Sequence, residues 1–267
     1  MKKHIKTVIN VILVLILIYS GYKIYSKLAD YKKADETYTQ LQEIHNNQIA
    51  NSTINNEDNK KNKPSNENKE SNKSNDDKIE NNDKTENSKS LSEINSDYKF
   101  WLNVNNTNIN YPVVQCDNNS FYLKHDFYKQ NSSSGAIFMD YRDNQESQNT
   151  ILYGHNMRNK TMFNNLLKFK DEAFFNQNNK IKVMKDDQEY IYEVFSAYTT
   201  EGNDDYLITN FSSNQEYQKY INDIKTKSLF KSNVEVSEKD KIITLSTCSY
   251  EFDDARTVVH GKLVTLS

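Results

Sequence analysis

Cys248 has the most distinctive chemistry in this chain, because it stands where a strand-like segment gives way to a polar loop. The apolar run "KIITLSTC" ends at this cysteine, and "SYEFDD" follows it. A lone cysteine in a core strand is usually a small buried hydrophobe. A thiol at a strand end that faces a loop can instead act as a nucleophile, provided that a base or a cation stabilises its thiolate.

Three of the five histidines are candidates for that base. His155 ends the strand-like run "NTILYGH", so its ring can project from the end of a strand. His260 shares a strand face with Arg256, but four residues along a strand correspond to ~13 Å. His125 lies in the loop-like segment "FYLKHDFY". We favour His155, and His260 and His125 remain the alternatives.

Arginine is rare in this lysine-rich chain, which makes each arginine informative. The three arginines are Arg142, Arg158 and Arg256. A planar and permanently charged fork suits sites that must bind an oxyanion. Arg256 opens the strand after the cysteine loop, so a hairpin would place its side chain beside Cys248, where it can donate to an oxyanion. A salt bridge to Asp253 or Asp254 is the alternative.

Composition excludes several classes of function. The net charge of −3 gives no basic surface for nucleic acid, and the five glycines are too scattered to form a phosphate-binding loop. Cys116 and Cys248 are too few for a disulfide framework, although one disulfide between them is formally possible. No spacing of His, Cys or acidic residues suggests a metal site. We therefore expect an activity that needs no metal or cofactor, and no nucleic-acid partner.

Residues 1–25 have the pattern of a lysine-rich cytoplasmic leader, which contains His4, followed by a membrane signal-anchor. The apolar core of "VINVILVLILIYSGY" is short for a span of ~20 residues, but the tyrosines after it can form an interfacial belt. A cleaved signal peptide is the alternative, although no small-residue cleavage pattern follows the core. The leading lysines predict a single-pass protein with a cytoplasmic N-terminus and an extracytoplasmic C-terminal part.

Residues 26–90 are expected to connect the membrane to the working domain. Residues 26–45, which include His45, are predicted to form a polar stalk. Residues 46–90 consist almost entirely of Asn, Lys, Ser, Asp and Glu, so they bury too little apolar surface to fold. A disordered chain of that length has an end-to-end distance of about 35–40 Å, and we expect it to suspend the domain above the membrane.

Residues 91–267 have the composition and the apolar patterns of a folded domain. Short runs rich in β-branched and aromatic residues predict strands, and "KDDQ" predicts a hairpin between two of them. The segments "TMFNNLLKF" and "SNQEYQKYINDIKTKSLF" have apolar residues at helical spacing. Many strands with few helices predict a mainly β fold, a closed or nearly closed barrel decorated by helices. The predicted strands are "KFWLNV", "GAIFMDY", "TILYGH", "KIKVM", "EYIYEVFSAY", "KIITLSTC" and "RTVVHGKLVTL".

The order of these motifs closely resembles that of the sortases of Gram-positive bacteria, class B in particular. The resemblance covers about residues 97–267 and includes "TLSTC", "NTILYGHN", "NYPVVQ", "GAIFMDYR" and "TMFNNLLKF". The helix expected over residues 213–227, before the cysteine strand, is also similar to class B. The resemblance implies a sortase-type closed β-barrel and a catalytic trio of His155, Cys248 and Arg256.

The resemblance also implies which residues bind the substrate peptide. They are Asn119 and Leu123 of an "N-x-x-Y-L" element, Tyr206 and Leu207 of the loop that carries the inserted helix, and Ser246 beside the cysteine. Ordinary core packing is the alternative for Tyr122, Leu123 and Leu207.

The activity implied is that of a membrane-anchored cysteine transpeptidase. It would cleave a C-terminal sorting motif after threonine through a thioester and transfer the protein to an amine of peptidoglycan or of its lipid-linked precursor. Its partners would be surface proteins with a sorting signal and, through the N-terminal helix, the cytoplasmic membrane. The alternatives are a secreted cysteine peptidase that uses water as acceptor and a non-catalytic cell-wall-binding module.

Overall fold

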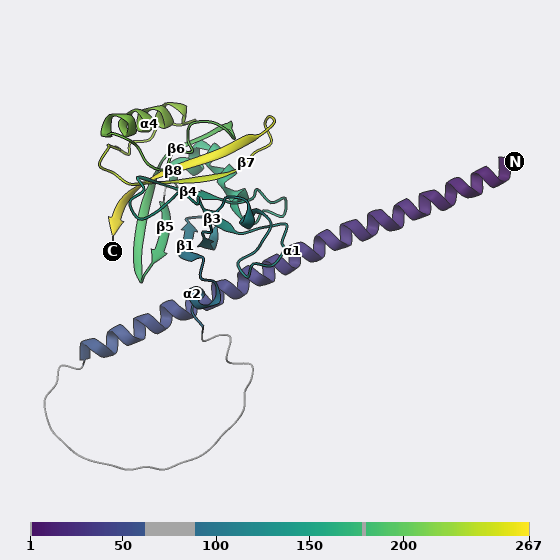
Figure 1. Ribbon diagram of the computed structural model, residues 1–267, viewed down its shortest axis with the longest axis horizontal. Helices are drawn as coiled ribbons and strands as arrows, with labels where there is room; N and C mark the ends of the chain where they lie inside the picture. The colour runs from purple at the N-terminus through teal and green to yellow at the C-terminus, as the bar shows by residue number, and fades with distance from the viewer. Residues whose placement is uncertain (1, 62–88, 178–179, 267) are drawn as a thin grey trace, which may run out of the picture.

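The computed structural model describes residues 2–61, 89–177 and 180–266. Figure 1 shows a barrel beside one very long helix, α1 (Lys2–Lys61). The strands are β1 (Tyr98–Val104), β2 (Asn110–Val114), β3 (Ile137–Met139), β4 (Asn149–Tyr153), β5 (Lys180–Lys185), β6 (Gln188–Glu201), β7 (Ile242–Cys248) and β8 (Ala255–Leu266). The shorter helices are α2 (Leu91–Ile94), η2 (Phe121–Leu123), η3 (Phe163–Lys170), α3 (Glu172–Gln177) and α4 (Asn214–Lys227).

The strands close into a barrel in the order β1-β2-β3-β4-β7-β8-β6-β5, which confirms the predicted mainly β fold. The pairs β2–β3 and β4–β7 are parallel, and the other neighbouring strands are antiparallel. Strand β2, which contains Pro112, is an addition to the strands predicted from the sequence. This proline is paired with Trp101 of β1, and β3 joins β2 only at Val113 and Val114. Pro112 therefore precedes the part of β2 that pairs on both sides.

Two local predictions from the sequence agree with the structure. Asp186 and Asp187 form the turn between β5 and β6, and their φ angles of 50° and 60° suit a tight hairpin turn. Helix α4 begins after the N-cap Ser213 and buries the residues predicted for its apolar face, Tyr217, Tyr220, Ile221 and Ile224. The segment "TMFNNLLKF" forms the 3₁₀ helix η3 rather than an α-helix.

The C-terminal half of α1 packs against the barrel, which the sequence analysis did not expect of a polar stalk. Tyr38, Leu41 and Ile44 are buried in the same core cluster as the strands. The imidazole of His45 stacks on the indole of Trp101, with ring centroids 4.1 Å apart. Residues 34–45 are therefore part of the folded domain, although we expected that domain to begin at residue 91.

The N-terminal half of α1 is exposed and apolar. Within the described residues, α1 contains the single segment long and apolar enough to cross a membrane. An 18-residue stretch of it has a mean hydropathy of 1.9 and contains no buried residue. The same helix continues to Lys61, so residues 46–61, which we expected to be disordered, are helical. The expectation for residues 62–88 lies outside the described part of the chain.

Candidate active site

Strand register brings Cys248 and Arg256 together at one end of the barrel. The two residues are direct partners in the antiparallel pair β7–β8, and both are half-buried. The parallel pair β4–β7 ends with Tyr153 opposite Ser246, and the Gly154 amide continues it by donating to the Ser246 carbonyl at 3.3 Å. His155 is the next residue on this side, so β4 delivers it to the same barrel end as Cys248.

A backbone carbonyl orients the imidazole of His155. Its Nε2 lies 2.7 Å from the carbonyl oxygen of Leu123, and since a carbonyl only accepts, Nε2 carries the proton. Gly135 supports that carbonyl from behind, with φ of +57°. A Cβ at Gly135 would lie 2.5 Å from the oxygen of Tyr122 and 3.0 Å from that of Leu123. The acceptor for His155 therefore depends on a glycine at position 135.

The residues that flank His155 fix the ends of β4 and β7 to each other. Gly154 lies so close to Ile137 and Phe163 that a Cβ would be 2.4 Å from the first and 2.9 Å from the second. The Asn156 amide donates to the carbonyl of Cys248 at 2.9 Å. Sequence reasoning did not single out Asn156, although its position beside the favoured histidine was a signal.

Arg256 makes the ion pair that the sequence analysis gave as the alternative. Its Nη2 lies 2.6 Å from Oδ1 of Asp254. Its Nη1 donates to the carbonyls of Asp254 and Ala255 at 3.0 and 3.1 Å. The side chain of Asp254 is 62% exposed and that of Arg256 is 26% exposed. The guanidinium is therefore held at the start of β8 by a partner that faces solvent.

The other candidate histidines occupy different environments. His260 is fully buried, with Nδ1 2.8 Å from the Thr244 hydroxyl and Nε2 3.0 Å from that of Tyr198. Burial is the main cause that lowers the pKa of His260 to about 3, so it stays neutral. His125 stacks on Phe121 and lies 2.7 Å from its carbonyl through Nδ1.

Some of the residues expected to bind peptide are engaged with the fold. Tyr206 and Ser246 are buried, and their hydroxyls lie 2.9 Å apart. The side chain of Leu123 is exposed, and that of Leu207 is half-buried. Tyr122 is a core residue whose hydroxyl donates to Asp97 at 2.7 Å, so core packing describes it.

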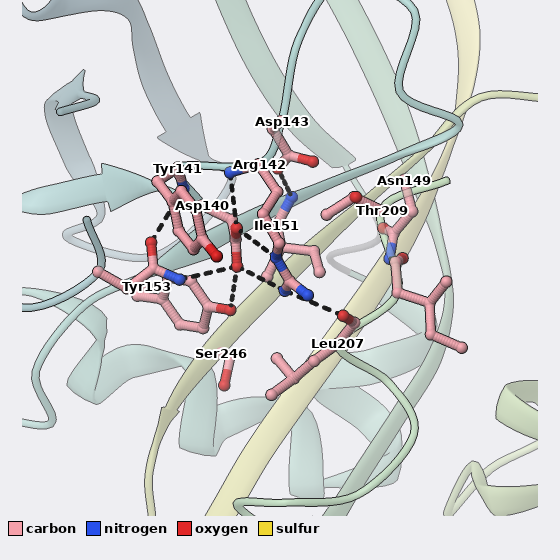
Figure 2. A network of polar contacts seen from close by, with 12 residues as sticks. Asp140, Tyr141, Arg142, Asp143, Asn149, Ile151, Tyr153, Leu207, Thr209 and Ser246 are labelled. Atoms are coloured by element: carbon pink, nitrogen blue, oxygen red, sulfur yellow. Dashed lines mark hydrogen bonds and ion pairs between the residues drawn. The ribbon is translucent and has the colours of Figure 1, made fainter. Parts of the chain in front are cut away.

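A buried carboxylate, Asp140, organises the region beside these residues. Arg142 donates to it through Nε at 2.9 Å and through Nη2 at 2.8 Å, and Tyr153 donates through its hydroxyl at 2.8 Å. The Asn119 amide donates to the same carboxylate at 2.9 Å. Figure 2 shows Arg142 extending from Asp140 to the carbonyl of Leu207, a hydrogen bond of 3.0 Å. Sequence reasoning missed Asp140, because only the fold brings these segments together.

The hydrogen bonds of this network decide its charge state. Burial by itself raises the pKa of Asp140, but the hydrogen bonds from Arg142, Tyr153 and Asn119 outweigh it and hold the pKa below its usual range. Burial and the neighbouring Asp140 raise the pKa of Tyr153, so its hydroxyl remains a donor. Asp140 is therefore a carboxylate at neutral pH.

The described residues give no sign of a metal centre or a disulfide. Within residues 2–61, 89–177 and 180–266, no group of three His, Cys, Asp or Glu side chains is placed to hold a metal ion. Cys116 and Cys248 are both free thiols.

Comparisons with known proteins agree with this architecture. A family profile described as the Sortase domain matches residues 102–264. Sortase B of Staphylococcus aureus is 32% identical over 269 residues, covering 99% of each chain. Sortase B of Listeria monocytogenes is 38% identical over 66% of this chain and 74% of its own. Among solved structures, Clostridium perfringens sortase B has a TM-score of 0.64 and 42% identity, covering 66% of this chain and 98% of that one.

A closed barrel with a cysteine and an arginine paired at one end, matched by this profile, defines a cysteine transpeptidase. The chain belongs to the sortase family, and its relatives place it in class B. The family acts at the cell surface on surface proteins and cell-wall precursors, so the general role of this chain is transpeptidation that anchors surface proteins.

Proposed function

We propose that the protein is a membrane-anchored sortase in which Cys248 is the nucleophile, Arg256 stabilises the oxyanion and His155 transfers the proton. The observation that carries this proposal is the register that pairs Cys248 with Arg256 and ends the neighbouring β4 at Tyr153, two residues before His155. The exposed apolar half of α1 supports anchoring in the cytoplasmic membrane. The lysines before it favour a cytoplasmic N-terminus, with the barrel outside the cell.

In the first half-reaction, the Cys248 thiolate attacks the carbonyl carbon that follows threonine in the sorting motif. Arg256 stabilises the negative charge that develops on the carbonyl oxygen. The carbon–nitrogen bond then breaks, and the leaving amine takes a proton from the His155 imidazolium. The product is a thioester between Cys248 and the surface protein.

In the second half-reaction, an ammonium group of peptidoglycan or of its lipid-linked precursor gives a proton to the neutral His155. The free amine attacks the thioester and the carbon–sulfur bond breaks. A new amide forms as the nitrogen loses its second proton to solvent, and the Cys248 thiolate returns. The thioester conserves the activation of the acyl group, so the exchange needs no ATP. The residues proposed to hold the peptide are Asn119, Leu123, Tyr206, Leu207 and Ser246.

The test uses the full chain in detergent micelles with a panel of sorting peptides. We expect intact-mass spectrometry to show an acyl adduct on Cys248, and a wall-derived amine to convert that adduct into a new amide. If no peptide of the panel forms an adduct, the transpeptidase proposal is wrong. If adducts form but water is the sole acceptor across a broad set of amines, the protein is a peptidase.

A further inference from the structure

The buried Asp140 joins two segments that are distant in sequence and carry residues proposed to hold the peptide. On one side, both ends of the Asn119 amide are engaged: Nδ2 donates to Asp140, and Oδ1 accepts from the Tyr141 amide at 2.9 Å. On the other side, Arg142 spans from Asp140 to the carbonyl of Leu207. Asn119 and Leu207 are therefore tied to one carboxylate.

The carbonyl of Leu207 is held by Arg142, whereas the carbonyls of the residues on either side are held by other side chains. The Tyr206 carbonyl accepts from Tyr220 of α4 at 3.0 Å, and the Ile208 carbonyl accepts from Asn149 of β4 at 2.8 Å. The Leu207 carbonyl between them accepts from Arg142 at the edge of the barrel. Removing the Arg142 fork would therefore release Leu207 while its neighbours remain held.

The guanidinium chemistry explains why an arginine stands here in a lysine-rich chain. Nε and Nη2 bind the two oxygens of Asp140 as a fork, and Nη2 also reaches the carbonyl of Leu207. A lysine ammonium has the same charge but no planar fork, so it cannot reproduce these contacts with fixed geometry.

We propose that Asp140 and Arg142 are positioning residues, whose ion pair sets the separation of Asn119 and Leu207 and thereby the fit of the sorting peptide. We call this pair the Asp140–Arg142 clamp. The proposal rests on the proposed function in one respect, the assignment of Asn119 and Leu207 to peptide binding. The tie between the two segments is a separate claim and is tested separately.

The kinetic test compares Arg142→Lys with Arg158→Lys in the full chain. Arg158 is exposed, and the side chains that donate to Asp140 are those of Asn119, Arg142 and Tyr153, so Arg158→Lys matches the chemical change without touching the clamp. We expect Arg142→Lys to raise KM for the sorting peptide about tenfold, the effect of losing a hydrogen bond to a charged group, with kcat changed less than about twofold. In a Leu207→Ala background, the effect of Arg142→Lys should shrink, because the Leu207 side chain that Arg142 is proposed to position is then absent.

A readout that does not need catalysis tests the tie itself. The amides of Tyr141 and Arg142 donate to Asn119 and Asp140, so their hydrogen exchange reports whether the clamp is closed. We expect faster exchange at both amides in Arg142→Lys and an unchanged exchange rate in Arg158→Lys. Unchanged exchange, or a fall in kcat at constant KM, would overturn the clamp. If exchange is faster in Arg142→Lys but no sorting peptide forms an acyl adduct on the protein, the tie between the two segments stands and the proposed function is refuted instead.

Discussion

Two regions of the barrel hold histidines near polar partners, and they differ in where those partners come from. The α4 wall, in which Tyr217 and Tyr220 of α4 lie near Tyr198, Thr244 and His260 of the barrel, is buried. Its imidazole is bonded on both nitrogens by side chains of β6 and β7. The proposed catalytic rim, residues 154–156 and 248–256, holds the imidazole of His155 by one backbone carbonyl, that of Leu123 in η2.

Under the proposed function, the same residue type serves stability in one region and chemistry in the other. The Thr244 hydroxyl donates to Asn149 at 2.7 Å, so it accepts from Nδ1 of His260, whose Nε2 accepts from Tyr198. A neutral, fully bonded imidazole has no proton to exchange with a substrate. At the rim, His155 and Arg256 have partners at the surface, so a substrate can compete for them.

The largest expected effect is at the rim. Cys248→Ala should abolish acyl-enzyme formation, and His155→Ala should lower kcat about a thousandfold, since no proton donor for the leaving amine remains. Both variants should keep the wild-type Tm, because neither side chain belongs to the core. Peptide cleavage and thermal unfolding are the measurements, and substantial cleavage by Cys248→Ala would contradict the assignment.

The next effect is on stability and belongs to the α4 wall. His260→Ala should lower the free energy of unfolding by about 2–4 kcal/mol, since it opens a cavity and leaves the Tyr198 hydroxyl without its partner. Below the new Tm, kcat should stay within about twofold of wild type. Denaturant unfolding and peptide cleavage check both parts. A large loss of kcat in a folded His260→Ala protein would contradict the claim that the α4 wall serves stability and the rim serves catalysis.

A smaller effect separates charge from geometry at the rim. Arg256→Lys retains the positive charge but loses the planar fork, so we expect kcat to fall by roughly tenfold to a hundredfold without a change in stability. Arg158→Lys is the matched control. Single-turnover acylation is the measurement, and wild-type acylation by Arg256→Lys would remove this residue from the oxyanion role.

The smallest expected effect is on the pH dependence of stability, and it concerns the buried carboxyl group of Asp143. Within the described residues, Oδ1 of the buried Asp143 has no hydrogen-bond partner. Burial raises the pKa of Asp143 from 3.8 to about 7, so the folded protein binds a proton that the unfolded chain releases between these values. The free energy of unfolding therefore falls as pH rises through this window.

Asp143→Asn mimics the protonated side chain and should remove that fall. The measurement is the difference in Tm between about pH 5 and about pH 8, which should shrink in the variant. Asp240→Asn is the control, because hydrogen bonds from Ser237 and Lys262 outweigh burial and lower the pKa of Asp240. That carboxylate stays ionised between about pH 5 and about pH 8, so its replacement should leave the difference in Tm unchanged. An identical pH dependence in wild type and Asp143→Asn would show that Asp143 is ionised in both states.

The sequence carried enough to predict the barrel and the apolar face of α4, because these depend on local periodicity and on motif order. The catalytic roles of His155, Cys248 and Arg256 stay a prediction. The sequence also carried a signal that we did not use. Tyr31, Ala34, Tyr38, Leu41 and Ile44 recur at helical spacing within a segment whose composition is polar. Average composition concealed this stripe, which is the face of α1 that packs on the barrel.

Other features were not predictable from the sequence, because they depend on contacts between distant segments. The Asp140–Arg142 clamp joins residues from β4, from the segment before η2 and from the loop before α4. The carbonyl that orients His155 belongs to Leu123, and nothing in the local sequence marks that oxygen. Both require the strand order of the barrel to be known first.

The continuity of α1 changes how the barrel would meet its substrates. An α-helix rises 1.5 Å per residue, so the stretch from Tyr25 at the end of the apolar segment to Ala34 at the barrel spans about 14 Å. In the proposed membrane arrangement, α1 is a rigid support rather than a flexible tether. The length of residues 62–88 therefore does not set the distance between the barrel and the membrane. The search for a lipid-linked amine then becomes lateral diffusion in two dimensions. Its rate would follow the surface density of that lipid, not its concentration in solution.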